Sequence, residues 1–320
     1  MNFKNSARML VLLFAVVFCT SITCKAEEMF DGPAKRPENW SGLQQKAENG
    51  NAEAQFQVAL VYELGLGVPP DYSLAAAWYR RAADRGNSSA QNNLGGLFSR
   101  GLGVAQNDVE AVRWYMRSAA AGNPAGENNL GYMFAEGRGV SKSDESAVFW
   151  YRKAAAQGYA GAETNLGVMY GSGRGVGVDS AEAMKWYRKA AKRNFAPAEF
   201  ELGRMYLHGT GISQNAPESI KWFRKAADRG LSSAQAELGF AYSRGIGVPQ
   251  DDAQAEHWYR LAAAGGSPEG QHNLKVILAL RGRQGEAEGT LEATSATAPL
   301  TVPDPIELRP SSLLRREGER

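Results

Sequence analysis

The stretch Leu166–Ala191, LGVMYGSGRGVGVDSAEAMKWYRKAA, holds the features that decide the fold, because they return every 36 residues along the chain. Its Trp186 belongs to a column of residues 36 apart: Trp78, Trp114, Trp150, Trp186, Trp222 and Trp258. Gly173 and Gly175 belong to two further columns of six glycines each. A fixed period of this length is typical of stacked repeats, so the sequence predicts six units over residues 51–266.

Each unit is predicted to form two helices joined by a glycine turn. In the first half, apolar residues such as Leu166 and Tyr170 recur at the spacing of one helix face. Gly173 stands where a left-handed residue would end the first helix. Asp179 is an N-cap residue for the second helix, and Glu182 three positions later makes a capping box. The equivalent N-cap residues are Asp71, Asn107, Ser143, Asn215 and Asp251.

The pattern as a whole predicts an all-α fold, a right-handed α-solenoid of helix-turn-helix repeats. One unit cannot bury its own aromatic rings, so neighbouring units must stack. The predicted units are 51–86, 87–122, 123–158, 159–194, 195–230 and 231–266. Leu43 and Ala47 fall in second-helix columns, and Leu274 and Leu278 fall in first-helix columns. Residues 40–50 and 267–281 are therefore predicted to be half-repeat caps that complete a solenoid over 40–281.

Both ends of the chain differ in character from the repeats. Lys4 and Arg8 precede an apolar run over 9–18, and Cys24-Lys25-Ala26 fits signal peptidase cleavage, so residues 1–26 are predicted to be a signal peptide. The run is too short to span a bilayer, and the mature chain is expected to have no transmembrane span. Residues 27–39 are predicted to be a flexible lead and 282–320 a disordered tail rich in Gly, Glu, Thr and Pro.

Composition excludes several classes of function. Lys and Arg number 36 against 34 Asp and Glu, so no general electrostatic case exists for a nucleic-acid partner. Both cysteines, Cys19 and Cys24, lie in the predicted signal, which leaves no thiol for disulfides or metal sites in an exported chain. The three histidines fall in different columns, so no metal site or cofactor is expected.

The recurring pattern Leu-Gly-x-x-Tyr, Gly-x-Gly-Val and Ala-x-x-Trp-Tyr-x-Lys-Ala-Ala resembles the Sel-1-like repeat family, a relative of the tetratricopeptide repeat. Departures are small, such as Val58-Ala59 in place of Leu-Gly in the first unit and Phe223 in place of Tyr in the fifth. The resemblance implies an α-solenoid that serves as an adaptor between proteins. Some exported bacterial members are thought to contact host or envelope proteins.

Columns that change from unit to unit predict where a partner binds. On the first helices these columns form one stripe, and packing alone would have made them repeat. Tetratricopeptide units are similar in placing ligand contacts at these offsets on the concave face. The predicted partner-binding residues are Phe56, Leu60, Asn92, Asn128, Tyr132, Thr164, Phe200, Arg204, Phe240 and His272. The alternative interpretation of this stripe is plain solvent-facing surface.

Three classes of function compete. The first is an exported scaffold, periplasmic or secreted, that binds a protein or peptide in the groove. The second is a module for envelope glycan or peptidoglycan, because aromatic residues on a groove can also stack on sugars. The third is a β-lactamase-like hydrolase, disfavoured because no Ser-x-x-Lys, Lys-Thr-Gly or Gly-x-Ser-x-Gly occurs. The chain is therefore predicted not to be an enzyme. Basic pairs such as Arg152-Lys153 are predicted to form a solvated ridge, with an acidic partner as the alternative.

Overall fold

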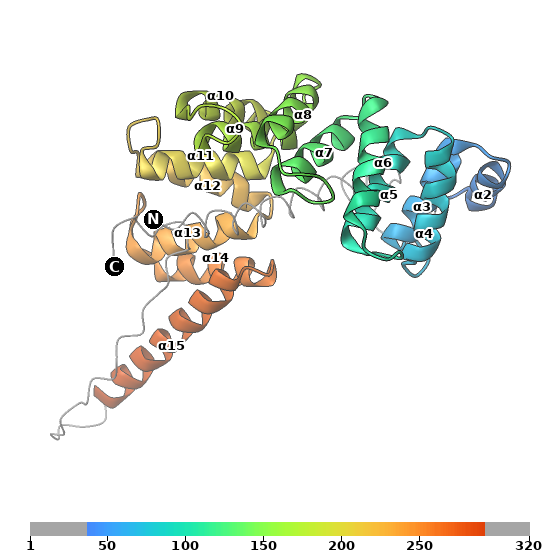
Figure 1. Cartoon of the computed structure of the whole chain (residues 1–320). Helices are drawn as coiled ribbons and strands as arrows, with labels where there is room; N and C mark the ends of the chain where they lie inside the picture. The colour runs from blue at the N-terminus through green and yellow to red at the C-terminus, as the bar shows by residue number, and fades with distance from the viewer. Residues whose placement is uncertain (1–36, 292–320) are drawn as a thin grey trace. The chain divides into compact units, whose positions relative to one another are not determined.

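The structure is a computed structural model that describes residues 37–291, which hold fourteen helices and no strand (Figure 1). The chain divides into two compact units, and the boundary along the sequence lies between Ala190 and Ala191, at the end of α10. The first unit contains α2 (Trp40–Glu48), α3 (Ala52–Leu64), α4 (Tyr72–Asp84), α5 (Ser88–Arg100), α6 (Asp108–Ala120), α7 (Pro124–Glu136), α8 (Asp144–Ala156), α9 (Ala160–Ser172) and most of α10 (Ser180–Ala191). The second contains α11 (Ala196–His208), α12 (Ala216–Asp228), α13 (Ser232–Arg244), α14 (Asp252–Ala264) and α15 (Pro268–Leu291).

The helix boundaries follow from the capping residues that the sequence predicts. Asn107 Oδ1 accepts a hydrogen bond from the Glu110 backbone N–H at 3.1 Å, and Asp179 Oδ1 accepts one from Glu182 at 2.9 Å. The first helices end at a left-handed glycine, as at Gly65 with φ 69°, a conformation that glycine adopts without steric cost. The predicted alternation of helix pairs and glycine turns is therefore confirmed within each of the two compact units.

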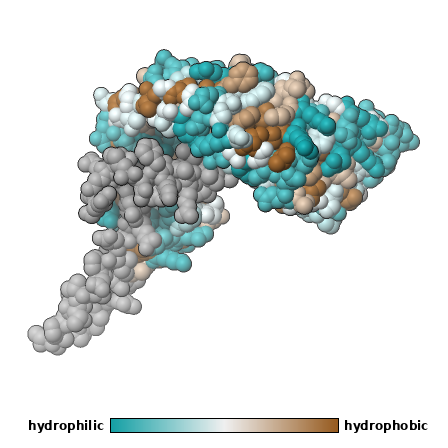
Figure 2. Space-filling view, viewed as in Figure 1, coloured by the Kyte–Doolittle hydropathy of each residue, from teal (hydrophilic) through white to brown (hydrophobic). Residues whose placement is uncertain are grey.

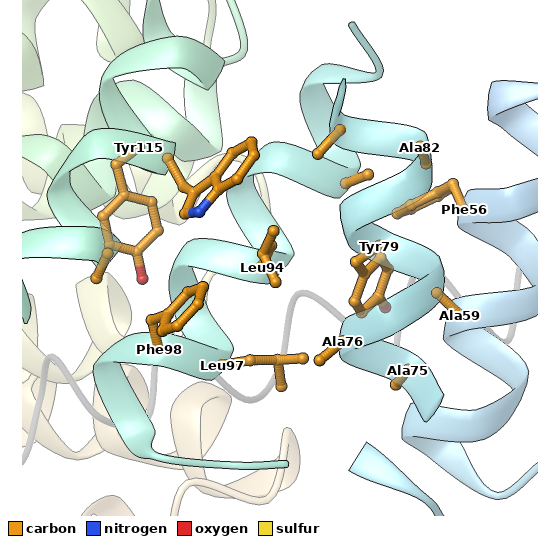
Figure 3. Close-up of a cluster of buried hydrophobic side chains, with 14 of the residues drawn as sticks. Phe56, Ala59, Ala75, Ala76, Tyr79, Ala82, Leu94, Leu97, Phe98 and Tyr115 are labelled. Atoms are coloured by element: carbon orange, nitrogen blue, oxygen red, sulfur yellow. The ribbon is translucent and has the colours of Figure 1, made fainter. Parts of the chain in front are cut away.

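In the second to sixth repeats the core forms where an aromatic residue of the second helix packs on a glycine of the first helix; this aromatic residue is Phe223 in the fifth repeat and a tyrosine in the other four. Tyr115 and Tyr151 have no exposed surface, and they lie against Gly95 and Gly131. A Cβ placed on Gly131 would come within 2.8 Å of the Tyr151 ring, so only a residue without a side chain lets the helices approach so closely. Figure 3 shows the same core in the first repeats, with the Tyr79 ring directed between its neighbouring helices.

The second glycine of a turn lies against the preceding repeat at Gly103, Gly139, Gly175 and Gly247. A Cβ on Gly139 would approach the backbone of α6, 2.8 Å from the Val109 nitrogen, and Gly103 is placed in the same way against α4. In the third and fourth repeats an arginine strengthens this joint. Arg138 donates to Asp108 at 2.7 Å and Arg174 donates to Asp144 at 2.6 Å. Backbone contact and ion pair together fix the spacing of successive repeats in the first unit.

The ends of the array are single helices. α2 is a lone second helix, and α15 is a lone first helix that continues past residue 281 to Leu291, so the predicted tail is helical over 282–291. This is a correction to the predicted limit of the cap. The predicted signal over 1–26, the lead before residue 37 and the tail beyond 291 lie outside the described residues.

Candidate functional site

The predicted stripe lies on α3, α5, α7 and α9 of the first unit and on α11, α13 and α15 of the second. Six of its ten side chains are buried within their own unit, and four keep partial exposure. The buried ones are Phe56, Leu60, Asn128, Thr164, Phe200 and Phe240. The accessible ones are Asn92, Tyr132, Arg204 and His272. Variability along the stripe therefore marks two different environments.

The phenylalanines of the stripe pack inside the repeats. Phe200 is 1% exposed, and its ring centroid lies 5.5 Å from that of Phe223 on α12. Phe56 lies 5.9 Å from the Tyr79 ring in the same way. An aromatic anchor for a partner must be accessible, and the Phe56 and Phe200 rings are buried. This corrects the expectation that the two rings face the groove. The physical reason is that each first helix is enclosed by its own second helix and by neighbouring helices.

Asparagines join successive first helices in the first unit. Asn129 Nδ2 on α7 donates to Asn92 Oδ1 on α5 at 2.8 Å, and Asn165 Nδ2 on α9 donates to Asn128 Oδ1 on α7 at 2.9 Å. A buried amide needs such partners, because an unpaired one loses its hydrogen bonds to water without replacement. Sequence reasoning missed this ladder, although the repeated Asn-Asn-Leu-Gly at Asn92 and Asn128 was a usable signal.

Tyr132 is the accessible aromatic residue of the first unit's stripe. Its ring packs against the apolar clusters on both sides of it, and its hydroxyl is hydrogen-bonded to Arg138. Burial lowers the pKa of Arg138, but hydrogen bonds to Asp108 and Tyr132 outweigh burial and raise it overall. Tyr132 is therefore held in a fixed orientation with part of its surface open to solvent.

Arg204 and His272 are the accessible stripe residues of the second unit. Arg204 Nη1 donates to both carboxylate oxygens of Glu201, at 3.0 and 3.2 Å, and its side chain is 30% exposed. Glu201 is buried, and Arg204 is its charged partner. His272 on α15 is half-buried.

A buried polar cluster around Tyr79 contains residue types that can transfer protons, but these residues hydrogen-bond to one another. The Tyr79 hydroxyl donates to Glu63 at 2.5 Å, Asn93 Nδ2 donates to that hydroxyl at 3.1 Å, and Arg100 lies 3.3 Å from Glu63. Burial first, and then the charge of Glu63, raise the pKa of Tyr79 well above its ordinary value. The tyrosine therefore stays protonated at neutral pH, and the cluster satisfies buried polar groups.

Buried glutamates occupy one column near the start of the first helices. Gln91 in this column donates to the Ala83 carbonyl at 3.0 Å, whereas Glu127 accepts from Gln157 at 2.8 Å and faces Lys153 at 3.8 Å. Burial raises the pKa of Glu127, and the hydrogen bond from Gln157 and the charge of Lys153 offset this only in part. Among the described residues, no cluster of three or more His, Cys, Asp or Glu could hold a metal ion.

Comparison with known protein families identifies the repeats. The model described as Sel1 repeat matches residues 52–87, 88–123, 124–159, 160–195, 196–231 and 232–267. Each segment begins one residue after the unit predicted from the period. A comparison with curated proteins gives no match.

Solved bacterial structures share the fold. A protective antigen present in uropathogenic Escherichia coli strains, which displays an SLR fold, is 37% identical with a TM-score of 0.62, and the match covers 78% of this chain and 52% of the antigen. The chain thus spans about half the length of that antigen. A Sel1 repeat protein from Oxalobacter formigenes is also 37% identical, with a TM-score of 0.63 and coverage of 75% and 69%. An immunity protein from Pseudomonas aeruginosa, at 21% identity and a TM-score of 0.51 over 68% and 83% of the two chains, shares the fold.

These similarities agree with the geometry. Within residues 37–291 no helix combines the length and the apolar character needed to cross a membrane. Solenoids of this kind are typically non-enzymatic, and proteins built from such repeats generally mediate protein–protein interactions. With six consecutive matches that cover more than half of its length, the chain belongs to the Sel1 repeat family.

Proposed function

We propose that this protein is an exported scaffold that binds a protein or peptide on the first-helix surfaces of its repeats. The observation that carries the proposal is the contrast between the columns. Tyr115, Tyr151 and their equivalents repeat because they pack identically, whereas Tyr132 and Arg204 are accessible and unlike their counterparts in other repeats. Side chains that reach solvent and that packing does not make repeat can be selected for a partner.

The accessible residues offer two kinds of contact. In the first unit, Tyr132 supplies a rigid aromatic surface and Asn92 an amide beside it on the neighbouring first helix. In the second unit, Arg204 supplies a charged donor, and His272 supplies an imidazole on α15. An aromatic residue and an arginine are the side-chain types that contribute most to protein interfaces. A peptide or an exposed helix of a partner fits such a surface better than a small molecule does.

A pair of neutral substitutions tests the second-unit surface without leaving a buried charge. Glu201→Gln with Arg204→Gln removes both charges, and Glu256→Gln with Arg260→Gln does the same to a comparable ion pair on second helix α14. We expect pull-down from the native envelope fraction to retrieve defined proteins with the wild type and the α14 variant. Their recovery with the Arg204 variant should fall at least about fivefold. Equal recovery with both variants would contradict the role of this surface.

Two further measurements separate the alternatives. Retention on purified peptidoglycan, with no protein retrieved, would replace the proposal by the glycan-binding function. Export is tested by N-terminal sequencing of the protein recovered outside the cytoplasm, which should begin at Glu27 if the segment 1–26 is cleaved after Ala26. A chain that begins at Met1 in that fraction would contradict cleavage.

A further inference from the structure

Two columns on the exposed side of the second helices hold large apolar side chains in neighbouring repeats. The column of Arg80 holds an arginine in every repeat except the second, where it holds Met116. The column of Ala77 holds a phenylalanine in the third repeat, Phe149, and otherwise holds Ala77, Arg113, Lys185, Lys221 and His257. Met116 is 43% exposed and Phe149 is 55% exposed. Each substitution places an apolar group in water, which packing within the chain does not explain.

These two side chains belong to one spot. Arg80 lies 5.9 Å from the Trp114 ring of the next repeat, and Arg224 lies 5.2 Å from the Trp258 ring in the same way. Because Met116 holds the equivalent position in its repeat, we expect it to lie near Trp150. Trp150 packs against the apolar cluster that contains α6. Its ring centroid lies 5.1 Å from that of Phe149, in an edge-to-face arrangement. Met116, Phe149 and Trp150 are called the Met116–Phe149 patch below. Figure 2 shows that the face of the molecule in view carries hydrophobic areas among hydrophilic ones.

Cations surround the patch. Lys153 lies over the Trp150 ring at 4.8 Å and is 47% exposed. Arg113 is 67% exposed and Arg117 is 60% exposed, on the same helix as Met116. Their acidic neighbours are Glu110 for Arg113, Asp84 at 3.8 Å for Arg117 and Glu127 at 3.8 Å for Lys153, and Glu145 is exposed on α8. Exposed pairs of this kind contribute little and can exchange for a carboxylate of a ligand.

We propose that the Met116–Phe149 patch is a second interaction surface, which binds an acidic amphipathic helix or strand of a protein partner. Apolar side chains of the partner would cover Phe149 and Met116, and flanking Asp or Glu would pair with Arg113, Arg117 and Lys153. Two exposed apolar side chains suit one or two anchors of a peptide. Insertion into a membrane interface requires a much longer apolar face.

The repeats themselves supply substitutions that keep the fold. Met116→Arg and Phe149→Lys install the residue types found at Arg152 and Lys185 in the same columns. Leu261→Lys is the matched control, because Leu261 is a 39% exposed second-helix residue whose column otherwise carries Arg or Lys. The probe is a fluorescein-labelled helical peptide of about 20 residues, with Leu and Phe on one face and Glu on the other. A second probe has every Glu replaced by Lys.

Fluorescence anisotropy measures the binding of both probes to the full chain. The acidic probe should bind wild type and Leu261→Lys equally, and at least about tenfold more weakly to the double variant. The lysine probe should bind wild type at least about tenfold more weakly than the acidic probe does. Added salt should weaken the binding of the acidic probe to wild type. Equal binding to the double variant, equal binding of both probes or no binding at all would overturn the proposal. So would a patch-dependent dimer in sedimentation, or patch-dependent binding to phosphatidylglycerol vesicles with none to the peptide.

Discussion

Replacing Gly167 by alanine tests the glycine–tyrosine contact in the core of the fourth repeat, which recurs in the second, third and sixth repeats. A Cβ at this position would lie 2.6 Å from Tyr187 Cδ1, where ordinary contacts are 3.4–4 Å. Tyr187 is only 5% exposed, so its ring cannot turn into solvent. The helices must therefore separate, and overpacking of this kind costs about 1–3 kcal/mol. Gly171 on the same helix is the control, because its Cβ would meet only Ala183, at 3.8 Å.

The comparison removes the effect of helix propensity. Alanine stabilises a helix relative to glycine by about 0.5–1 kcal/mol at either position. Gly171→Ala should therefore raise the free energy of unfolding by that amount. The free energy of unfolding of Gly167→Ala should be lower than that of Gly171→Ala by the overpacking cost, a gap of about 1–3 kcal/mol. The first repeat has Ala59 in this column, which shows that a helix pair can adjust its spacing for a methyl group when the whole repeat is built for it.

Urea unfolding followed by circular dichroism measures the gap, and hydrogen exchange in α9 and α10 shows whether the loss is local. Repeat arrays can unfold in parts, so the two midpoints are compared at an unchanged slope. If Gly167→Ala is as stable as Gly171→Ala, the reasoning that close approach of the helices requires glycine is refuted.

Two further predictions concern charges. Arg174→Ala removes the ion pair with Asp144 and should lower the free energy of unfolding by about 1–3 kcal/mol. Arg113→Ala removes an exposed ion pair within one helical turn and should change the free energy of unfolding by less than about 0.5 kcal/mol. Thermal melts of both variants check this. Glu127→Gln should stabilise the protein by about 1 kcal/mol at pH 7. Because the pKa of Glu127 is raised by folding, its contribution to stability falls as pH rises from 4.5 through the folded pKa, so the advantage of glutamine should shrink toward pH 4 and level off above the window. An advantage that does not depend on pH would contradict the assigned cause.

The helix pairs and their ends could be predicted from the sequence because the chemistry that sets them is local. Asn107 and Asp179 cap the backbone three residues ahead, and Gly65 closes a helix by its own conformation. Such contacts lie within a few residues of sequence and repeat with the period. The column of tyrosines was equally visible, since packing on the same neighbour imposes the same residue.

The candidate site was less predictable because variability has two causes. Phe200 and Asn128 vary since each fits one particular neighbour inside the array, whereas Tyr132 and Arg204 vary at positions that reach solvent. Both kinds escape the constraint that makes the other columns repeat. The partners involved lie a whole repeat away, as for Asn165 and Asn128, so only the folded arrangement separates packing from surface.

In the proposed function, accessible side chains of the first helices contact the partner. Photocrosslinking in the living cell tests it most directly, with p-benzoylphenylalanine placed at Tyr132, whose side chain has a similar shape. Val178, which is 71% exposed in a turn, carries the same group in the control. We expect a defined protein adduct from position 132 and none from position 178. An adduct from both positions, or from 178 alone, would contradict it.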